Sequence, residues 1–162
     1  MLAGILTVAP AAAHGPGDSV PACALMPLET HPHKSLADLR GQVVYLDFWA
    51  SWCAPCAKAF PHLNRIREEF SAQGFEVLGV NLDGRSADAQ AFLNRHRPSF
   101  ALATDKQGAC PRAFGVKAMP SGYLIDRAGV IRQVFTGFRA GDETRLRDAV
   151  QRLLQESPLP AS

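Results

Sequence analysis

Two cysteines separated by two residues are the side chains of this sequence best suited to chemistry. Cys53 and Cys56 lie in the stretch Trp52-Cys53-Ala54-Pro55-Cys56, directly after an apolar segment. If that segment is a strand leading into the first turn of a helix, the first sulfur meets the positive end of the helix dipole, which favours its thiolate. The second sulfur lies one turn further in. The spacing therefore predicts that Cys53 attacks a disulfide and that Cys56 resolves the mixed disulfide.

Half of a structural zinc site has the same cysteine spacing, so metal binding is the first alternative. A zinc site would need two further ligands, and the other cysteines, Cys23 and Cys110, are isolated in the sequence and do not form a second pair. The preceding apolar segment and the adjacent Trp52 also suit a redox helix better than a zinc knuckle. We therefore expect no metal ion and no other cofactor.

Strands and helices alternate around the cysteine pair. Apolar runs rich in β-branched residues predict buried strands, and apolar residues at helical spacing predict amphipathic helices. Strands are expected at 20–28, 42–49, 75–82, 100–104, 121–125 and 130–137, and helical segments at 35–41, 53–73, 86–97, 109–114 and 142–155. A βαβαβ unit followed by a hairpin and a helix predicts an α/β fold, with a mixed central sheet, helices on both faces and an N-terminal β extension.

The length and composition suit one globular domain. The chain has 162 residues, of which 47% are hydrophobic, enough to build a core. Its 17 basic and 15 acidic side chains nearly balance, and no basic run is interleaved with aromatic residues. We therefore expect no nucleic-acid partner. We also expect a monomer.

The first residues are similar to an export signal. Residues 1–13 are largely apolar and end in three alanines, like the apolar region and small-residue cleavage site of a secretory signal, although no Lys or Arg precedes them. We expect a truncated signal segment and flexible leader at 1–19, one domain at 20–155 and a flexible tail at 156–162. The expected location is the periplasm or another exported compartment. Whether the start is a cleaved signal peptide or an anchor stays open.

Several motifs together identify a family. In chain order they are Leu46 to Cys56, Gly115-Val116, Met119-Pro120 and Tyr123 to Asp126. This combination strongly resembles the thioredoxin superfamily. The segments 35–41 and 75–81 further resemble the TlpA, ResA and CcmG branch of exported thiol:disulfide interchange proteins. The resemblance spans about 20–154 and implies a thioredoxin fold that exchanges disulfides with client proteins.

The resemblance also implies roles for residues outside the pair. Asp47 corresponds to a buried acid that relays a proton to and from Cys56, and burial would raise its pKa. The alternative is an ordinary strand carboxylate facing solvent. Pro120, preceded by Met119, corresponds to a cis-proline whose loop binds an extended substrate segment. Trp52 would flank the nucleophile on the same docking surface, or pack in the core.

A second disulfide is expected between Cys23 and Cys110. In an oxidising compartment two remaining thiols tend to pair, and some TlpA-like proteins carry an extra bridge outside the active site. Two buried free cysteines are the alternative, because the sequence does not show whether the Cα atoms lie close enough.

The chain also departs from its family pattern. Ala59 stands where many ResA-like proteins carry a Glu, the segment 75–82 has no Lys to pair with the buried acid, and Ser121-Gly122 follows the proline where a Thr-rich pair is common. Proton handling would then rest on Asp47 and water. The client is left open by the unfamiliar loop.

Two other functions are weighed against disulfide exchange. His31 and His33, together with the cysteines, suggest a copper-handling chaperone as an alternative. Copper chaperones of similar fold are similar to one another in a Cys-x-x-x-Cys pattern, which this chain lacks. A non-catalytic interaction module would not need the intact cysteine pair. Family resemblance favours a reductant, and no His lies between the cysteines to stabilise the thiolate as in oxidising relatives. The electron donor is unknown, and a membrane-bound protein is one candidate.

Overall fold

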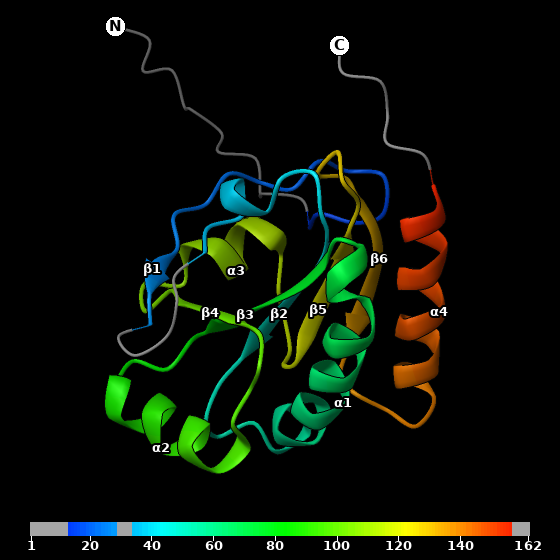
Figure 1. Cartoon of the computed structure of the whole chain (residues 1–162). Helices are drawn as coiled ribbons and strands as arrows, with labels where there is room; N and C mark the ends of the chain where they lie inside the picture. The colour runs from blue at the N-terminus through cyan, green and yellow to red at the C-terminus, as the bar shows by residue number, and fades with distance from the viewer. Residues whose placement is uncertain (1–12, 29–33, 157–162) are drawn as a thin grey trace, which may run out of the picture.

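The computed structural model describes residues 13–28 and 34–156. Its elements are, in chain order, β1 (Met26–Pro27), η1 (Ala37–Leu39), β2 (Val43–Trp49), α1 (Ala54–Phe70), η2 (Ser71–Gln73), β3 (Phe75–Asn81), α2 (Ser86–His96), β4 (Ala101–Thr104), α3 (Ala109–Phe114), β5 (Ser121–Ile125), β6 (Ile131–Thr136) and α4 (Asp142–Gln155). Within the described residues the strands form one sheet in the order β1-β4-β3-β2-β5-β6 (Figure 1).

The sheet is mixed, as the strand and helix order predicts. β2, β3 and β4 run parallel, because α1 and α2 carry the chain back between them. β5 is antiparallel to β2, β6 is antiparallel to β5, and β1 is antiparallel to β4. Long crossovers between parallel strands and a short turn between antiparallel ones are the connections that these pairings require.

Helices cover both faces of the sheet (Figure 1). α1, α2 and α4 pack on one face through apolar residues such as Phe60, Phe92 and Val150. α3 and η1 pack on the other face, where Phe114 and Leu39 are buried. The expected α/β class, with a mixed central sheet, helices on both faces and an N-terminal strand, is therefore confirmed.

The central strand β2 places its single acid toward α1. Every residue of β2 is buried. Successive side chains of a strand point to opposite faces, so Tyr45, Asp47 and Trp49 share one face while Leu46 and Phe48 share the other. Tyr45 and Trp49 belong to the apolar cluster under α1, and Leu46 and Phe48 belong to the cluster under α3. Alternation therefore turns Asp47 toward the helix that starts with the cysteine pair.

The N-terminal strand is much shorter than the sequence predicts. The strand expected over 20–28 is reduced to β1, Met26–Pro27, at the edge of the sheet. Upstream, the Val20 amide donates a hydrogen bond to the Gly129 carbonyl at 3.0 Å. Pro21 has no N–H and cannot continue a ladder from there, so the extension meets the sheet at two separate places.

Two helix ends also differ from expectation. The helix expected over 53–73 is α-helical only to Phe70 and closes through η2, where Gly74 adopts a φ of 92°. A left-handed φ of this kind favours glycine, which explains why the helical segment ends at this residue, after η2. The helix expected over 86–97 begins at Ser86 and ends at His96, one residue early. Arg97 follows it as the C-cap, with a φ of 39°.

Candidate active site

Cys53 stands at the N-terminal end of α1 as its N-cap, with an extended backbone (φ −89°, ψ 98°). Its Sγ accepts a hydrogen bond from the Cys56 amide at 3.2 Å, an amide in the first turn of the helix. The two sulfurs are joined as a disulfide. Cys53 is 4% exposed and Cys56 is fully enclosed. An incoming sulfur therefore reaches Cys53 first, and a Cys53 thiolate would lie against the Cys56 N–H at the positive end of the helix.

A buried carboxylate fixes the loop that presents Cys53. The Asp83 carboxylate accepts hydrogen bonds from the Ser51 amide at 2.9 Å, the Ser51 hydroxyl at 2.8 Å and the Asn81 side-chain amide at 2.7 Å. Asp83 and Asn81 are themselves buried. Sequence reasoning missed this network. A signal was present, because Ser51 and Asp83 each follow one of two neighbouring parallel strands, whose carboxyl ends meet at one edge of the sheet.

Asp47 is an isolated buried acid beneath α1. Its side chain shares the strand face of Tyr45 and Trp49, which pack in the same apolar cluster as Cys53 and Cys56. Asp47 is 1% exposed, so the alternative of a solvent-facing carboxylate is wrong. Its Oδ2 atom has no hydrogen-bond partner. Burial raises the pKa of Asp47 to about 8, so the carboxyl group can hold a proton near neutral pH and release it slightly above.

The Met119–Pro120 loop packs against the same apolar cluster as the cysteine pair. The peptide bond between these residues is cis, the isomer that the family resemblance implies. Met119 packs against the apolar cluster that contains both cysteines. The Ser121 hydroxyl donates to the Ala118 carbonyl at 2.7 Å, and the Gly137 amide donates to the Pro120 carbonyl at 2.8 Å. The loop is thereby held to the start of β5 and to the end of β6.

The two tryptophans near the pair have opposite surroundings. Trp52 is 73% exposed directly beside the nucleophile, so the alternative that it packs in the core is wrong. Trp49 is fully buried, with its ring 5.2 Å from Phe60 and 4.8 Å from Phe92. Of the two tryptophans, Trp52 is therefore the one that offers an apolar surface to an approaching client.

Cys23 and Cys110 meet on the other face of the sheet. Their sulfurs are bonded in the structure, their Cα atoms lie 5.1 Å apart, and 87 positions separate them in sequence. Cys110 is fully enclosed in α3, and its amide donates to Asp105 Oδ2 at 2.6 Å. The bond lies in the cluster under α3, apart from the cluster that holds Cys53 and Cys56.

The family departures predicted from the sequence lie in the same site. Ala59 is buried one turn after Cys56, in the position where many ResA-like proteins carry a Glu. Gly122 lies directly across from Asp47 in the β2–β5 pairing. The absent Lys leaves β3 with Gly79 opposite Asp47 on its other side. Asp47 is thus flanked on both neighbouring strands by residues without a side chain.

Metal binding finds no support in the part of the chain that the structure describes. No group of three or more His, Cys, Asp or Glu residues is placed there to hold a metal ion. His31 and His33, on which the copper alternative depends, lie outside the described residues. Among the described helices, none is both long and apolar enough to cross a membrane.

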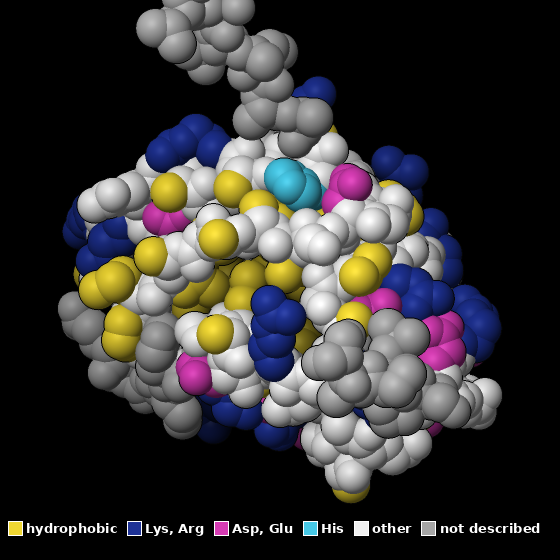
Figure 2. Space-filling view, turned by 90° about the horizontal axis from the view of Figure 1, so that it is seen from above, with side chains coloured by type: hydrophobic (Ala, Val, Ile, Leu, Met, Phe, Trp, Pro, Cys, Tyr) yellow, Lys and Arg dark blue, Asp and Glu magenta, His cyan; other side chains and the backbone are white. Residues whose placement is uncertain are grey.

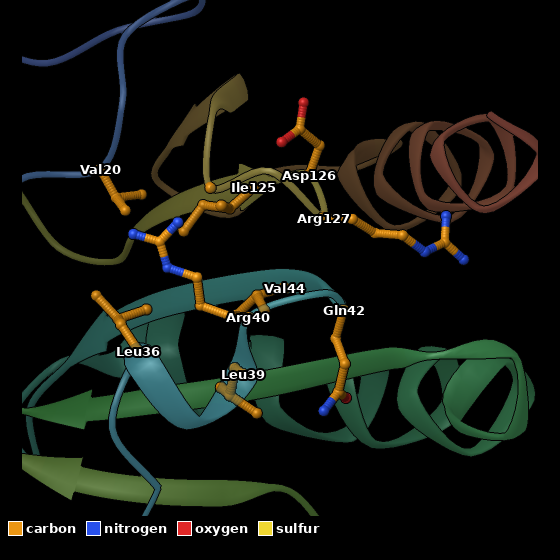
Figure 3. Close-up of a pocket in the computed structure, with 10 residues that line it drawn as sticks. Val20, Leu36, Leu39, Arg40, Gln42, Val44, Ile125, Asp126 and Arg127 are labelled. Atoms are coloured by element: carbon orange, nitrogen blue, oxygen red, sulfur yellow. The ribbon is translucent and has the colours of Figure 1, made fainter. Parts of the chain in front are cut away.

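A small hollow lies at the opposite end of the molecule, where β2 begins. Figure 2 looks down on this end and shows hydrophobic side chains around a depression with a basic side chain beside it. The hollow holds only about 20 Å³ between Leu36, Val44 and Ile125, with Arg40 over it (Figure 3). Arg127 points away from it and donates to the Leu153 carbonyl at 3.2 Å. A space of this size admits about one water molecule, so the hollow is no substrate site.

Comparisons with known proteins agree with this site. The model of the Redoxin family matches residues 15–150. A thiol-disulfide oxidoreductase ResA from Geobacillus kaustophilus is 34% identical over 121 residues, which cover 75% of this chain and 69% of the relative. The family match spans the cysteine pair, the acid and the proline loop.

Solved structures place the fold in the same group. A Chlorobium tepidum protein described as a thiol:disulfide interchange protein DsbE superposes with a TM-score of 0.83 at 41% identity, covering 88% of this chain and 99% of that one. The thioredoxin domain of a Bacteroides vulgatus thiol-disulfide oxidoreductase gives a TM-score of 0.74 at 24% identity over 86% of this chain and 98% of that one, a likeness of fold alone. The chain therefore belongs to the Redoxin family and is a thiol:disulfide oxidoreductase of the TlpA, ResA and CcmG type within the thioredoxin superfamily.

Proposed function

We propose that this oxidoreductase reduces disulfides in exported client proteins, with Cys53 as the nucleophile, Cys56 as the resolving thiol and Asp47 as the proton relay. One observation carries the proposal. A slightly exposed N-cap sulfur accepts a hydrogen bond from a first-turn amide, and the second sulfur is enclosed on the same sheet face as an unpaired buried acid. This arrangement separates an attacking sulfur from a sulfur that only an internal partner can reach.

The reaction starts from the dithiol form. The Cys53 thiolate attacks one sulfur of the client disulfide, a mixed disulfide forms, and the other client sulfur leaves as a thiolate and takes up a proton. Asp47 then accepts the Cys56 proton. The Cys56 thiolate attacks Cys53 Sγ, which forms the enzyme disulfide and releases the second client thiolate. Two electrons have passed from the enzyme to the client.

Asp47 suits the relay because its pKa lies near the working pH. A group with a pKa of about 8 is populated in both protonation states between pH 7 and 9. A carboxylate in water would hold no proton there. The lack of a hydrogen-bond partner on Oδ2 leaves that atom free to accept the Cys56 proton, directly or through water.

Client docking is assigned to the exposed rim of the pair. Trp52 offers an apolar face, and the loop of Met119 and Pro120 would pair its backbone with an extended client segment. The direction of electron flow is taken from the family resemblance, and the Ala54-Pro55 dipeptide, which places no His between the cysteines, adds support. An electron donor must restore the dithiol after each turnover, and a membrane-bound protein is one candidate.

Export and a structural disulfide belong to the same proposal. The Cys23–Cys110 bond would tie the N-terminal extension to α3 and would persist in an oxidising compartment. The apolar start of the chain would supply the export signal, with the working domain at 20–155 acting as a monomer. The two histidines on which the copper alternative depends lie outside the described residues.

The reduction potential separates a reductant from an oxidant. The protein is equilibrated with mixtures of reduced and oxidised glutathione, and the fraction of the Cys53–Cys56 disulfide is measured by alkylation and mass spectrometry. We expect a potential of about −250 mV or lower, on the side of reducing thioredoxins. A value near about −120 mV, typical of strong oxidants of this fold, would contradict the proposed direction.

A further inference from the structure

A groove lies between α1 and the loop that joins β6 to α4. It encloses about 460 Å³ and is lined by Lys58, His62, Phe138, Arg139, Gly141 and Glu143. Nothing in the reaction described above uses these side chains. We call it the Lys58–Arg139 groove, after the two cations on its walls.

The groove begins a short distance along α1 from the site of chemistry. Lys58 lies five residues after Cys53 on α1, a rise of about 7.5 Å along the helix axis. On the opposite wall, Phe138 packs against the cluster that contains both cysteines. The Gly137 amide, directly before Phe138, donates to the Pro120 carbonyl at 2.8 Å. A segment bound along the proline loop would therefore enter this groove as it leaves the cysteine pair.

The charges in the groove are unbalanced. Its acid, Glu143, already accepts a hydrogen bond from Arg65 at 2.8 Å and contacts the His62 ring. Lys58 and Arg139 are both exposed, and within residues 13–28 and 34–156 neither side chain makes a hydrogen bond or an ion pair. The groove therefore presents two free cations and one neutralised carboxylate.

We propose that the Lys58–Arg139 groove binds a client segment that carries an Asp or Glu side chain close to the disulfide being reduced. The inference rests on the proposed function and adds a substrate preference to it. An extended chain advances about 3.3 Å per residue, so a rise of this length places the client carboxylate two to three residues from the attacked cysteine. Half-buried Phe138 supplies an apolar floor for the methylenes of that side chain.

The test compares peptides that differ only in charge. Three peptides with the same intramolecular disulfide carry Glu, Gln or Lys three residues from the attacked cysteine, and kcat/KM is measured for each with the full chain. We expect the wild type to prefer the Glu peptide over the Lys peptide by about 5-fold to 10-fold at low salt. The pair is exposed, so 0.5 M salt should remove most of this preference.

Charge reversal assigns the preference to the groove. The double variant Lys58→Glu with Arg139→Glu should invert the preference toward the Lys peptide, and Lys58→Gln with Arg139→Gln should abolish it while changing the surface less. The matched control is Arg40→Glu with Arg152→Glu, which makes the same change in net charge. Both control residues are exposed, Arg40 beside the start of β2 and Arg152 in the last turn of α4.

Each outcome decides the question. Equal kcat/KM values for the Glu and Lys peptides with the wild type would overturn the groove, and so would a control variant that inverts the preference as strongly as the groove variant. Reduction of hydroxyethyl disulfide, which carries no charge, by the wild type tests the proposed function separately. If the wild type failed to reduce that compound, the proposed function would be wrong. If it reduced the compound but showed equal kcat/KM values for the Glu and Lys peptides, only the groove proposal would be wrong.

Discussion

The Tyr45 hydroxyl occupies the place where a Cβ atom on Gly122 would have to be: the two positions are only 1.8 Å apart. Gly122 is the residue directly across from Asp47 in the pairing of β2 with β5. Opposite residues of an antiparallel pair share a face, so the phenol lies over the missing side chain and next to the buried acid. The Tyr45 hydroxyl therefore leaves no room for a side chain at position 122.

Gly122→Ala should therefore destabilise the fold by about 1–3 kcal/mol, because the new methyl group displaces Tyr45 in a close-packed region. Urea unfolding followed by circular dichroism measures the effect. Gly84→Ala is the matched control, because nothing lies within 4 Å of a Cβ at that position. Equal free energies of unfolding for wild type and Gly122→Ala would show that the Tyr45 side chain does not fill this space.

Asp47 makes stability depend on pH. Its pKa is about 8 in the folded protein, against 3.8 for an ordinary Asp. Between these values the unfolded chain has lost the proton and the native state has kept it, so raising the pH favours unfolding, by up to ~1.4 kcal/mol per pH unit. Asp47→Asn has no such proton. Its free energy of unfolding should exceed that of the wild type by a margin that grows from pH 4 to pH 8.

The same substitution should slow the chemistry. Without a proton acceptor, resolution of the mixed disulfide by Cys56 should fall by about 10²-fold at pH 7 and recover at higher pH, as the thiol ionises by itself. Quenched-flow alkylation at a series of pH values measures this rate. Asp88→Asn, an exposed carboxylate of α2, is the control for both experiments. A stability margin that does not grow with pH, together with resolution rates equal to those of the wild type at every pH, would remove Asp47 from the mechanism.

The loop before Cys53 should depend on Asp83. Asp83→Ala leaves the Ser51 amide and the Asn81 side chain without their acceptor, at a cost of about 1–3 kcal/mol. Hydrogen exchange at the Ser51 amide reports on this loop directly and should accelerate. Asp83→Asn keeps one acceptor oxygen, so its exchange rate should lie between those of wild type and Asp83→Ala. Unchanged protection of Ser51 in the alanine variant would exclude this role.

The second disulfide can be mapped by stepwise reduction. Under mild reducing conditions we expect alkylation of Cys53 and Cys56 only, with Cys23 and Cys110 labelled after denaturation and reduction. Closing a loop of 87 positions stabilises by about 4–5 kcal/mol in the chain-entropy model. Labelling of Cys23 or Cys110 in denatured protein that was never reduced would show that the bond is absent.

Local patterns were enough to predict most of the fold. The bounds of α3 and α4 agree with the sequence prediction, because a glycine precedes and follows α3 and a glycine precedes α4. The burial of Asp47 was implied by the family resemblance, and its place within the apolar run of β2 agrees with it. In each case the deciding interactions are between residues close in sequence, or concern burial of a whole strand, and both leave a trace in the order of residues.

The remaining features depend on contacts between distant segments. Asp83 holds Ser51 across 32 positions, Tyr45 fills the space over Gly122, and Arg139 faces Lys58 only because the β6–α4 loop returns to α1. A single sequence does not show which of its distant residues come into contact. The predicted length of the N-terminal strand was wrong for a related reason. That length depends on which of its backbone groups find partners on β4 and next to the start of β6.

The most direct test of the account is to trap the mixed disulfide. Each cysteine variant is incubated with an oxidised client protein, and covalent complexes are resolved on non-reducing gels and mapped by mass spectrometry. Cys56→Ser should accumulate a complex through Cys53, because the nucleophile attacks and nothing resolves the product. Cys53→Ser should form no covalent complex, since Cys56 is enclosed in the first turn of α1. Equal trapping by both variants, or trapping through Cys56, would contradict the assignment of Cys53 as the attacking sulfur.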